Sequence, residues 1–568
     1  MTRNTPVLGG LILENFKAFG ARQAIPFAPI TLIFGPNGAG KSSIIQSLLL
    51  LKQSMLDTHS PDDLLVPQGS LVDLGSPLDL VFKKEPNSTF EITPLMNVPT
   101  ADESLESHLL YRAKAPEGLP IGIGVRTHYS TKTKRLELQS LPAYIGNEAA
   151  YALQGTESPR DSGINRARPG RASLQRHFAD FGELFDTHPV WKELYQAFQD
   201  NLPEAQTILE NLLVSIDLVN HPKGEWSNSA NHLFDSALVS ELIKRFSEYR
   251  FESYLNDIRS SAAHCSFELD QFSLMHSCHQ WRGPELRSYL LRMLEPDYAA
   301  SEADYESSAR SRIPNLGDLS TTLWESLRHF LDQLIFLGPL REYPARHRVT
   351  AGLVAADLDK SGRLTWDVLA KDEQLIAQTN RRLNAFGTGF ALQVDRLKFE
   401  PLKQTSGSKR NRQPEPIPMY AVRLIDERTG TPVNIRDVGF GVSQLIPVIV
   451  QSEIARNRTL IIEQPELHLH PRLQSHLGTL FRDGIRPPHN NQYIIETHSQ
   501  HVILRLQRHV REGDLTPSDI SVIYVERDGT GSNCQYLPLD VDGEFTVEWP
   551  HGFFEETYRE MFGLDGDR

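Results

Sequence analysis

The sequence predicts an α/β fold whose core is split by a large, mainly helical insertion. The apolar run Ile30–Phe34 enters a glycine-rich turn that the apolar stretch Ile44–Leu51 follows, which is the order strand, loop, helix. Much farther along, Leu460–Glu463 has the continuous apolar pattern of a buried parallel strand. Between them, apolar residues recur over a long stretch at helical spacing. The two ends of the chain are therefore expected to build one core.

Size and composition indicate a folded protein with more than one lobe. The chain has 568 residues, 39% of them hydrophobic, which is too long for a single ordinary core. Its three cysteines are sparse, the N-terminus has no signal-peptide pattern, and no window approaches the ~20 apolar residues of a membrane span. We therefore expect a cytoplasmic protein without a membrane contact. The net charge of −14 argues against a surface that coats nucleic acid throughout.

Three segments are expected along the chain. Residues 1–150 would form the N-terminal half of the core, with strands near residues 71–82, 90–92, 121–128 and 136–141. Residues 151–335 would be the helical insertion, opened by a polar loop at 151–175 and followed by apolar residues at helical spacing such as Phe178 and Phe181. Residues 336–568 would complete the core, interrupted by a second polar loop at 403–418.

The glycine-rich turn matches the full phosphate-loop pattern GxxxxGK[ST]. It follows a strand and opens a helix, which is the context in which this pattern binds nucleotide phosphates. Backbone N–H groups would surround the phosphates, Lys41 would neutralise the β and γ oxygens, and Ser42 would bind Mg²⁺. The predicted ATP-binding residues here are Gly35, Pro36, Asn37, Gly38, Ala39, Gly40, Lys41, Ser42 and Ser43.

The strand 459–463 resembles a Walker B strand, because it delivers acidic residues to the edge of the sheet at which α/β proteins bind ligands. Glu463 is predicted to hold Mg²⁺ together with Ser42. The next residue is Gln464, whose amide can orient water but cannot accept a proton. Hydrolysis is then slow, uses Glu466 instead, or has been suppressed by an engineered Gln464, and the sequence leaves these three readings open.

Two further segments point to the same edge. The apolar run Tyr493–Ile495 is followed by His498, which we predict to sense the γ-phosphate. Upstream, a Gly and Ser turn opens an apolar helix, and a helix N-terminus of this kind suits a phosphate. The residues predicted to bind nucleotide in this second segment are Gly441, Ser443 and Gln444.

The order of these motifs resembles that of the ABC-type ATPases of the SMC, RecF and OLD group. The segments Leu337–Pro344 and Trp549–Phe554 look more closely like a bacterial subfamily that includes PtuA-like defence ATPases of Septu or retron type. The resemblance implies that two heads sandwich ATP, with Ser443 of one head touching the γ-phosphate held by Lys41 of the other. It also implies an Mg-contacting glutamine after the first helix, for which Gln53 and Gln68 both remain open.

Other clusters carry weaker signals. His264, Cys265, His276, Cys278 and His279 are metal-ligand types without clean CxxC pairs, so zinc is not expected. Basic residues in the two polar loops could grip DNA or RNA phosphates, or could be solvated: Arg160, Arg166, Arg168, Arg171, Arg176, Lys403, Lys409, Arg410 and Arg412. The segment after His498 is too short for the Toprim nuclease of OLD-type relatives, so any cleavage would belong to a partner.

Three functions follow as hypotheses. The first is a slowly hydrolysing ABC-type ATPase that forms homodimers or higher oligomers and regulates a partner nuclease, of HNH type, in antiphage defence; the defence role is implied by resemblance alone. The second is a RecF-like DNA-repair clamp that binds DNA directly. The third is a scaffold that holds ATP almost irreversibly because of Gln464.

Overall fold

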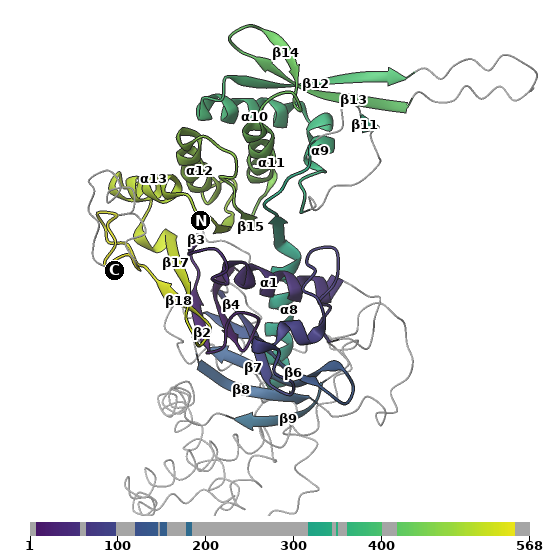
Figure 1. The fold of residues 1–568 in the computed structure, drawn as a ribbon, viewed down its shortest axis with the longest axis vertical. Coiled ribbons are helices and arrows are strands. Elements are labelled where there is room, and N and C mark those ends of the chain that lie inside the picture. The colour runs from purple at the N-terminus through teal and green to yellow at the C-terminus, as the bar shows by residue number, and fades with distance from the viewer. Residues whose placement is uncertain are drawn as a thin grey trace, which may run out of the picture.

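The computed structural model describes residues 7–56, 64–97, 120–145, 148–155, 178–184, 316–343, 348–349, 360–399 and 417–550. Within these ranges the chain forms three sheets and two helical layers (Figure 1). The insertion core at 185–315, the five His and Cys residues, both basic loops and the residues after Pro550 lie outside the described residues, so the expectations placed on them stay predictions. Among the described helices, none combines the length and apolarity needed to cross a membrane.

The central sheet joins both ends of the chain. Among the described strands its order is β10-β15-β16-β3-β17-β18, and every neighbouring pair is parallel except β17 with β18. Strand β3, from the N-terminal part, therefore lies between two strands of the C-terminal part. The split core predicted from the sequence is confirmed. The bounds are β3 Ile30–Phe34, β10 Leu334–Leu337, β15 Thr459–Glu463, β16 Gln492–Glu496, β17 Ile520–Arg527 and β18 Ser532–Tyr536.

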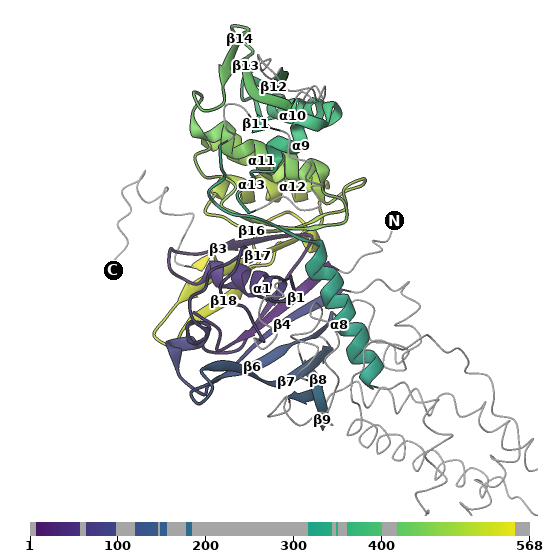
Figure 2. The same ribbon diagram turned by 90° about the vertical axis from the view of Figure 1, so that its right-hand side faces the viewer.

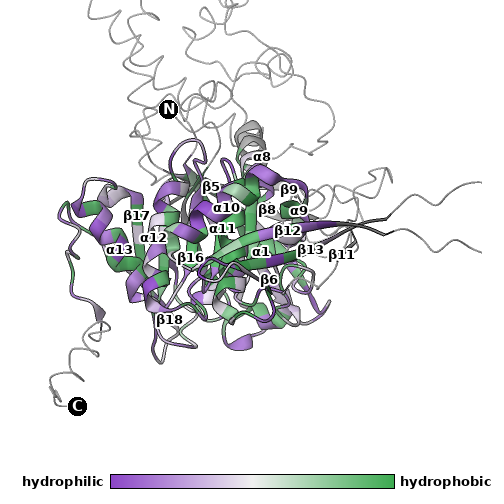
Figure 3. Ribbon diagram, turned by 90° about the horizontal axis from the view of Figure 1, so that it is seen from above, coloured by the Kyte–Doolittle hydropathy of each residue, from purple (hydrophilic) through white to green (hydrophobic). Residues whose placement is uncertain are grey.

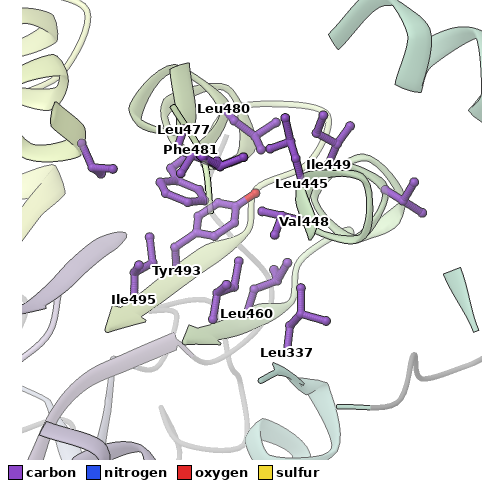
Figure 4. Packing of buried hydrophobic residues seen from close by; sticks show 14 of the residues in the cluster. Leu337, Leu445, Val448, Ile449, Leu460, Leu477, Leu480, Phe481, Tyr493 and Ile495 are labelled. Atoms are coloured by element: carbon purple, nitrogen blue, oxygen red, sulfur yellow. The ribbon is translucent and has the colours of Figure 1, made fainter. Parts of the chain in front are cut away.

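Both faces of this sheet are buried, because successive strand residues point to opposite sides. On one face Leu460, Tyr493 and Ile495 pack against helices α11 and α12, as Figure 4 shows, and helix α13 belongs to the same core. On the other face Ile461 and Ile494 join the core around helix α1. This two-sided burial explains the continuous apolar runs in the sequence. The helices are α1 Lys41–Leu56, α11 Phe440–Ile454, α12 Pro471–Gly484 and α13 Gln500–Arg511.

An antiparallel sheet lies on the α1 side. Its described strands follow the order β2-β1-β4-β5-β7-β8-β9, with β6 beside β4 and β7. Helix α8, Leu316–Gln333, lies alongside it and buries Leu323, Leu327 and Phe330 in the same core as α1 (Figure 2). The strands are β1 Val7–Glu14, β2 Gln23–Pro26, β4 Thr89–Asn97, β5 Ile121–Ile123, β6 Val125–Ser130, β7 Arg135–Ile145, β8 Glu148–Gly155 and β9 Phe178–Leu184.

A third, smaller sheet lies on the far side of helix α11 from the central sheet and projects outward (Figure 1). It pairs β11 Arg348–Val349, β12 Phe390–Phe399, β13 Ile417–Asp426 and β14 Thr431–Asn434, and the helices α9 Thr365–Lys371 and α10 Glu373–Phe386 pack against it. In Figure 3 the helix α11 is mainly hydrophobic in colour, whereas α13 alternates between hydrophilic and hydrophobic residues. Helix α11 is thus an interior helix and α13 a surface one.

Three expectations about local structure were wrong. Most of residues 71–82 forms turns and the short 3₁₀-helix Pro77–Leu80 instead of a strand. The spacing at Phe178 and Phe181 indicated a helix, but these residues belong to strand β9, because pairing with β8 overrides local periodicity. The boundaries 150 and 335 also cut the core: β8 and β9 extend the first sheet, and α8 packs with α1. The helices predicted for the insertion core, residues 185–315, lie outside the described residues, so they stay a prediction.

Candidate nucleotide site

The phosphate loop lies between β3 and α1 and depends on glycine for its shape. Gly35, Gly38 and Gly40 have positive φ angles of 142°, 76° and 104°, which side-chain-bearing residues rarely adopt. A Cβ on Gly35 would lie 2.0 Å from the main-chain oxygen of Val525 in β17, whereas a Cβ on Gly38 would meet nothing within 4 Å. The loop is therefore packed tightly at its base and open at its apex.

Lys41 folds back over this loop. Its Nζ donates hydrogen bonds of 2.9 Å to the main-chain oxygens of Gly35 and Pro36. Burial lowers the pKa of Lys41, and the charges of Glu496 and Glu466 oppose that shift. Phosphate oxygens could replace these two carbonyls as hydrogen-bond acceptors. They would form stronger, charge-assisted bonds with the Lys41 ammonium group.

Two carboxylates meet beside Ser42 at the ends of adjacent strands. Ser42 Oγ donates to Glu496 Oε2 at 2.9 Å, and Glu496 is the register partner of Glu463 across β15 and β16. Burial, and next the charge of Glu496, raise the pKa of Glu463 to about 7. Burial also raises the pKa of Glu496, against the Ser42 hydrogen bond and the charge of Lys41. Two buried carboxylates and a hydroxyl form an oxygen donor set that suits a hard divalent cation such as Mg²⁺.

Glu466 stands in the turn after β15 and is nearly buried, with 9% of its surface exposed. Its Oε1 accepts a 2.7 Å hydrogen bond from the main-chain N–H of His498. Its Oε2 is buried and has no hydrogen-bond partner among the described residues. Burial raises the pKa of Glu466, and the His498 bond lowers it. This carboxylate therefore keeps one oxygen free to accept a proton.

Gln464 holds a backbone conformation that few non-glycine residues adopt, with φ at 44°. Its N–H donates to the main-chain oxygen of Glu496 at 2.8 Å, and its own oxygen accepts from Leu467 N at 3.1 Å. These main-chain hydrogen bonds fix the backbone of the turn that carries both Gln464 and Glu466. Burial and the charge of Lys41 lower the pKa of His498, so its imidazole is neutral at pH 7.

The second predicted segment opens helix α11. Ser443 is buried, and its hydroxyl donates to the Phe440 main-chain oxygen at 2.7 Å. Gly441 leaves no room for a Cβ, which would lie 2.8 Å from the main-chain oxygen of His468. Gln444 uses both ends of its amide on the main chain of Arg341, so its side chain is occupied within the subunit. Beside this helix start lies an open cavity of about 450 Å³, lined in part by Leu340, Tyr343, Phe440 and His468.

The two glutamines after the first helix have different surroundings. The buried Gln53 amide donates to the main-chain oxygens of Val66 and Val72 and accepts from Leu71 and Val72. It thereby shapes the loop after α1. Gln68 lies exposed on that same loop. Of the two glutamines, Gln68 thus has the side chain that is free to reach an incoming ligand.

Arg341 and Glu496 also belong to this site, and sequence reasoning did not assign them. Both stood in segments already singled out, Leu337–Pro344 and the end of the strand with Tyr493. A carboxylate at the carboxyl end of a strand neighbouring Walker B was the available signal for Glu496. No pattern in the sequence around Arg341 indicated that its side chain would reach the end of β15.

The sheet order and the assembled site define the class: this chain contains a P-loop ATPase head. Residues 352–503 match the family described as AAA ATPase domain, and residues 11–62 match the family described as AAA domain. Residues 515–564 match a protein family of unknown function, DUF3696. The two ATPase matches cover the Walker A loop and the Walker B strand from opposite sides of the insertion.

Individual proteins and solved structures are also similar to this chain. A 38-residue stretch is 55% identical to the chromosome partition protein Smc of Synechocystis sp., and covers 6% of this chain and 3% of that protein. The Smc head of Pyrococcus furiosus, bound to the C-terminal domain of ScpA, is 12% identical over 99% of this chain and 100% of that chain, with a TM-score of 0.36. The SMC head of Thermotoga maritima is 10% identical over 93% and 98%, with a TM-score of 0.33.

Proposed function

We propose that this chain binds Mg-ATP at the loop 35–42 and hydrolyses it slowly. The observation that carries the proposal is the meeting of Lys41 and Ser42 with Glu463, Glu466 and Glu496, which come from the two ends of the sequence. Backbone N–H groups and Lys41 would hold the phosphates. Ser42 and Glu463 would hold Mg²⁺, with Glu496 beside them. When bound, Mg²⁺ neutralises charge on the β and γ oxygens.

The residues that would act on the attacking water lie mainly in the turn after β15. Glu466 is the group there that can take a proton from water, since its Oε2 is buried without a hydrogen bond and its pKa is raised by burial. Gln464 would orient the water through its amide. His498, neutral at pH 7, can donate to the γ-phosphate or accept from water. Turnover without a glutamate at position 464 is expected to be slow, so ATP occupancy would act as a timed switch.

Two copies would close around the nucleotide. Leu340 and Phe440 are 72% and 56% exposed beside the start of α11, which gives an apolar surface where a second head would dock. The helix start with Ser443 would then face the phosphates bound by the other copy. Higher oligomers can be built on such a dimer.

The partner and the biological role rest on resemblance. The segments Leu337–Pro344 and Trp549–Phe554 look like those of PtuA-like defence ATPases. We therefore propose that ATP-dependent closure regulates an HNH-type nuclease during antiphage defence. DNA or RNA contact would be made through the basic loops or through that partner.

The ATP site is tested by replacing Lys41 with Ala. Titration with a fluorescent ATP analogue and Mg²⁺ should show affinity reduced about 10- to 100-fold, because one charge-assisted contact is lost. Lys132→Ala, in the exposed turn after β6, is the control and should bind normally. Unchanged affinity in Lys41→Ala would remove the basis of the proposal.

Dimer closure and partner are tested separately. Lys41→Ala and Ser443→Arg subunits, each inactive alone, should recover part of the hydrolysis rate when mixed, because the mixed dimer contains one intact composite site. Co-expression with an HNH-type nuclease from the same genome should yield a complex and reduce phage plaques in a Lys41-dependent way. Strong, salt-dependent binding of DNA by the purified chain, without any nuclease, would instead favour the RecF-like clamp.

A further inference from the structure

Arg341 reaches from the end of one central strand to the end of its neighbour. It follows β10, and its guanidinium extends to the turn after β15. Nη2 donates a 2.7 Å hydrogen bond to the main-chain oxygen of Glu463, and Nη1 lies 3.5 Å from that of Gln464. The side chain is almost fully buried, with 4% exposed. One forked side chain thus holds two consecutive carbonyls at the start of the turn after β15.

The main chain of Arg341 is held in turn by the helix α11. Arg341 N–H donates to Gln444 Oε1 at 2.9 Å, and Gln444 Nε2 donates to the Arg341 oxygen at 2.8 Å. Gln444 follows Ser443 directly, and both lie in the first turns of the helix. A pair of buried hydrogen bonds leaves little freedom between the two segments, so a shift of the helix start carries residue 341 with it.

The charge of Arg341 is costly where it lies. Burial lowers its pKa to about 10, while the charges of Glu466 and Glu463 raise it, so it stays a cation at pH 7. Its Nε is buried and has no hydrogen-bond partner among the described residues. Burying a cation with an unsatisfied donor costs desolvation free energy, and apolar side chains could join two strand ends without that cost. A structural role alone therefore does not explain why an arginine stands at position 341.

We propose that Arg341 is a positioning residue that transmits movement of the α11 start to the hydrolytic turn of its own subunit. Gln444 would pull the backbone of Arg341 when the helix start engages a second head. The guanidinium would then move relative to the Glu463 and Gln464 carbonyls, and the side chains of Gln464 and Glu466 would be re-aimed at the phosphate loop. This inference rests on the proposed function, since it assigns the route by which closure of two heads reaches hydrolysis.

The first test compares Arg341→Lys with Arg458→Lys. Lysine keeps the charge but cannot hold two carbonyls in a fork. We expect the single-turnover hydrolysis rate of Arg341→Lys to fall about 10- to 100-fold, because small misplacements at a reacting centre have that effect. Nucleotide Kd should stay within about twofold, because Lys41 and its loop are untouched. Arg458, whose Nη1 donates to the Asp332 main-chain oxygen, is the matched control and should change neither.

The second test removes the link and leaves Arg341 in place. Gln444→Leu is compared with Gln507→Leu, whose buried Nε2 donates to the Gly543 oxygen away from the site. Hydrogen exchange of the peptide covering residues 463–467 is measured with and without ATP. We expect ATP to protect this peptide in the parent and in Gln507→Leu, and the protection to be lost in Gln444→Leu while nucleotide still binds.

The outcomes separate the inference from the function beneath it. If Lys41→Ala binds nucleotide normally, the ATP site itself is wrong. If Lys41→Ala fails to bind but Arg341→Lys and Gln444→Leu behave like their controls, the ATP site stands and the coupling role is overturned. Equal losses of Kd and rate in Arg341→Lys would show a structural role only and would also overturn it. Should Arg341→Lys unfold, the exchange measurement on Gln444→Leu decides.

Discussion

The hydroxyl of Ser42 donates a 2.9 Å hydrogen bond to Glu496 across 454 positions of sequence. Ser42 opens the helix after the phosphate loop, and Glu496 ends the strand beside Walker B. The contact links the first part of the core to the last at the point where Mg²⁺ is proposed to bind. Four predictions follow from the site and its surroundings.

Glu496→Gln should lower the affinity of the nucleotide site for Mg²⁺, so that a higher Mg²⁺ concentration is needed for half-maximal nucleotide binding. The carboxylate lies against Ser42 and next to Glu463, and loss of such a supporting group typically costs 10- to 100-fold in metal affinity. Fluorescent-nucleotide binding titrated with Mg²⁺ measures this. Glu544→Gln, a surface residue paired with Arg511, is the control. An unchanged Mg²⁺ midpoint would exclude Glu496 from the site.

Gln464→Glu should increase the steady-state rate of ATP hydrolysis, by about 100-fold or more if the new carboxylate becomes the general base. Glu466→Gln should reduce the parental rate, because it removes the group with a free, buried oxygen. Phosphate release is the measurement for both. If Gln464→Glu gains nothing and Glu466→Gln loses nothing, proton transfer does not run through this turn.

Gly35→Ala and Gly38→Ala should separate folding from binding. The added Cβ at residue 35 meets the Val525 oxygen at 2.0 Å, so about 3 kcal/mol or more of stability should be lost. At residue 38 the φ of 76° costs about 1–2 kcal/mol, with no clash. Gly38→Ala should therefore stay folded yet bind ATP poorly. Thermal unfolding and nucleotide titration together check this, and equal Tm values for both variants would contradict it.

His489 should make stability fall below pH 6.5. Arg456 Nη1 lies 2.6 Å from His489 Nδ1, which must accept, so the ring is neutral with its proton on Nε2 facing Glu453. Burial, and next the charge of Arg456, lower its pKa in the folded state. The unfolded chain then takes up the proton first as pH falls, so stability present above pH 6.5 is lost below it.

The check is the free energy of unfolding from pH 7.5 to 5.5 for the parent and for His489→Asn, whose Oδ1 can still accept from Arg456. The variant should show a shallower slope. His501→Asn, at an exposed position on α13, serves for comparison. A slope identical to that of the parent would mean that His489 does not titrate in this range.

Much of the core could be predicted because its signals are local. The glycines of the phosphate loop, the apolar run of β15 and the strand before His498 each carry their pattern within a few residues, and a strand buried on both faces has few alternatives. The helical reading of Phe178 and Phe181 failed because those residues gain more from pairing with β8 than from their own spacing.

The sequence by itself determined that Lys41, Ser42 and Glu463 lie at one edge of the central sheet, where we propose that phosphate binds, because loop shape and strand ends follow from short-range sterics and burial. Only the tertiary structure decided which distant groups complete that edge. Glu496 accepts a hydrogen bond from Ser42, and the Gln53 side chain forms its hydrogen bonds within the loop after α1. Arg341 connects the start of α11 to the turn after β15. Those choices depend on strand order and on the reach of single side chains, which no local pattern records.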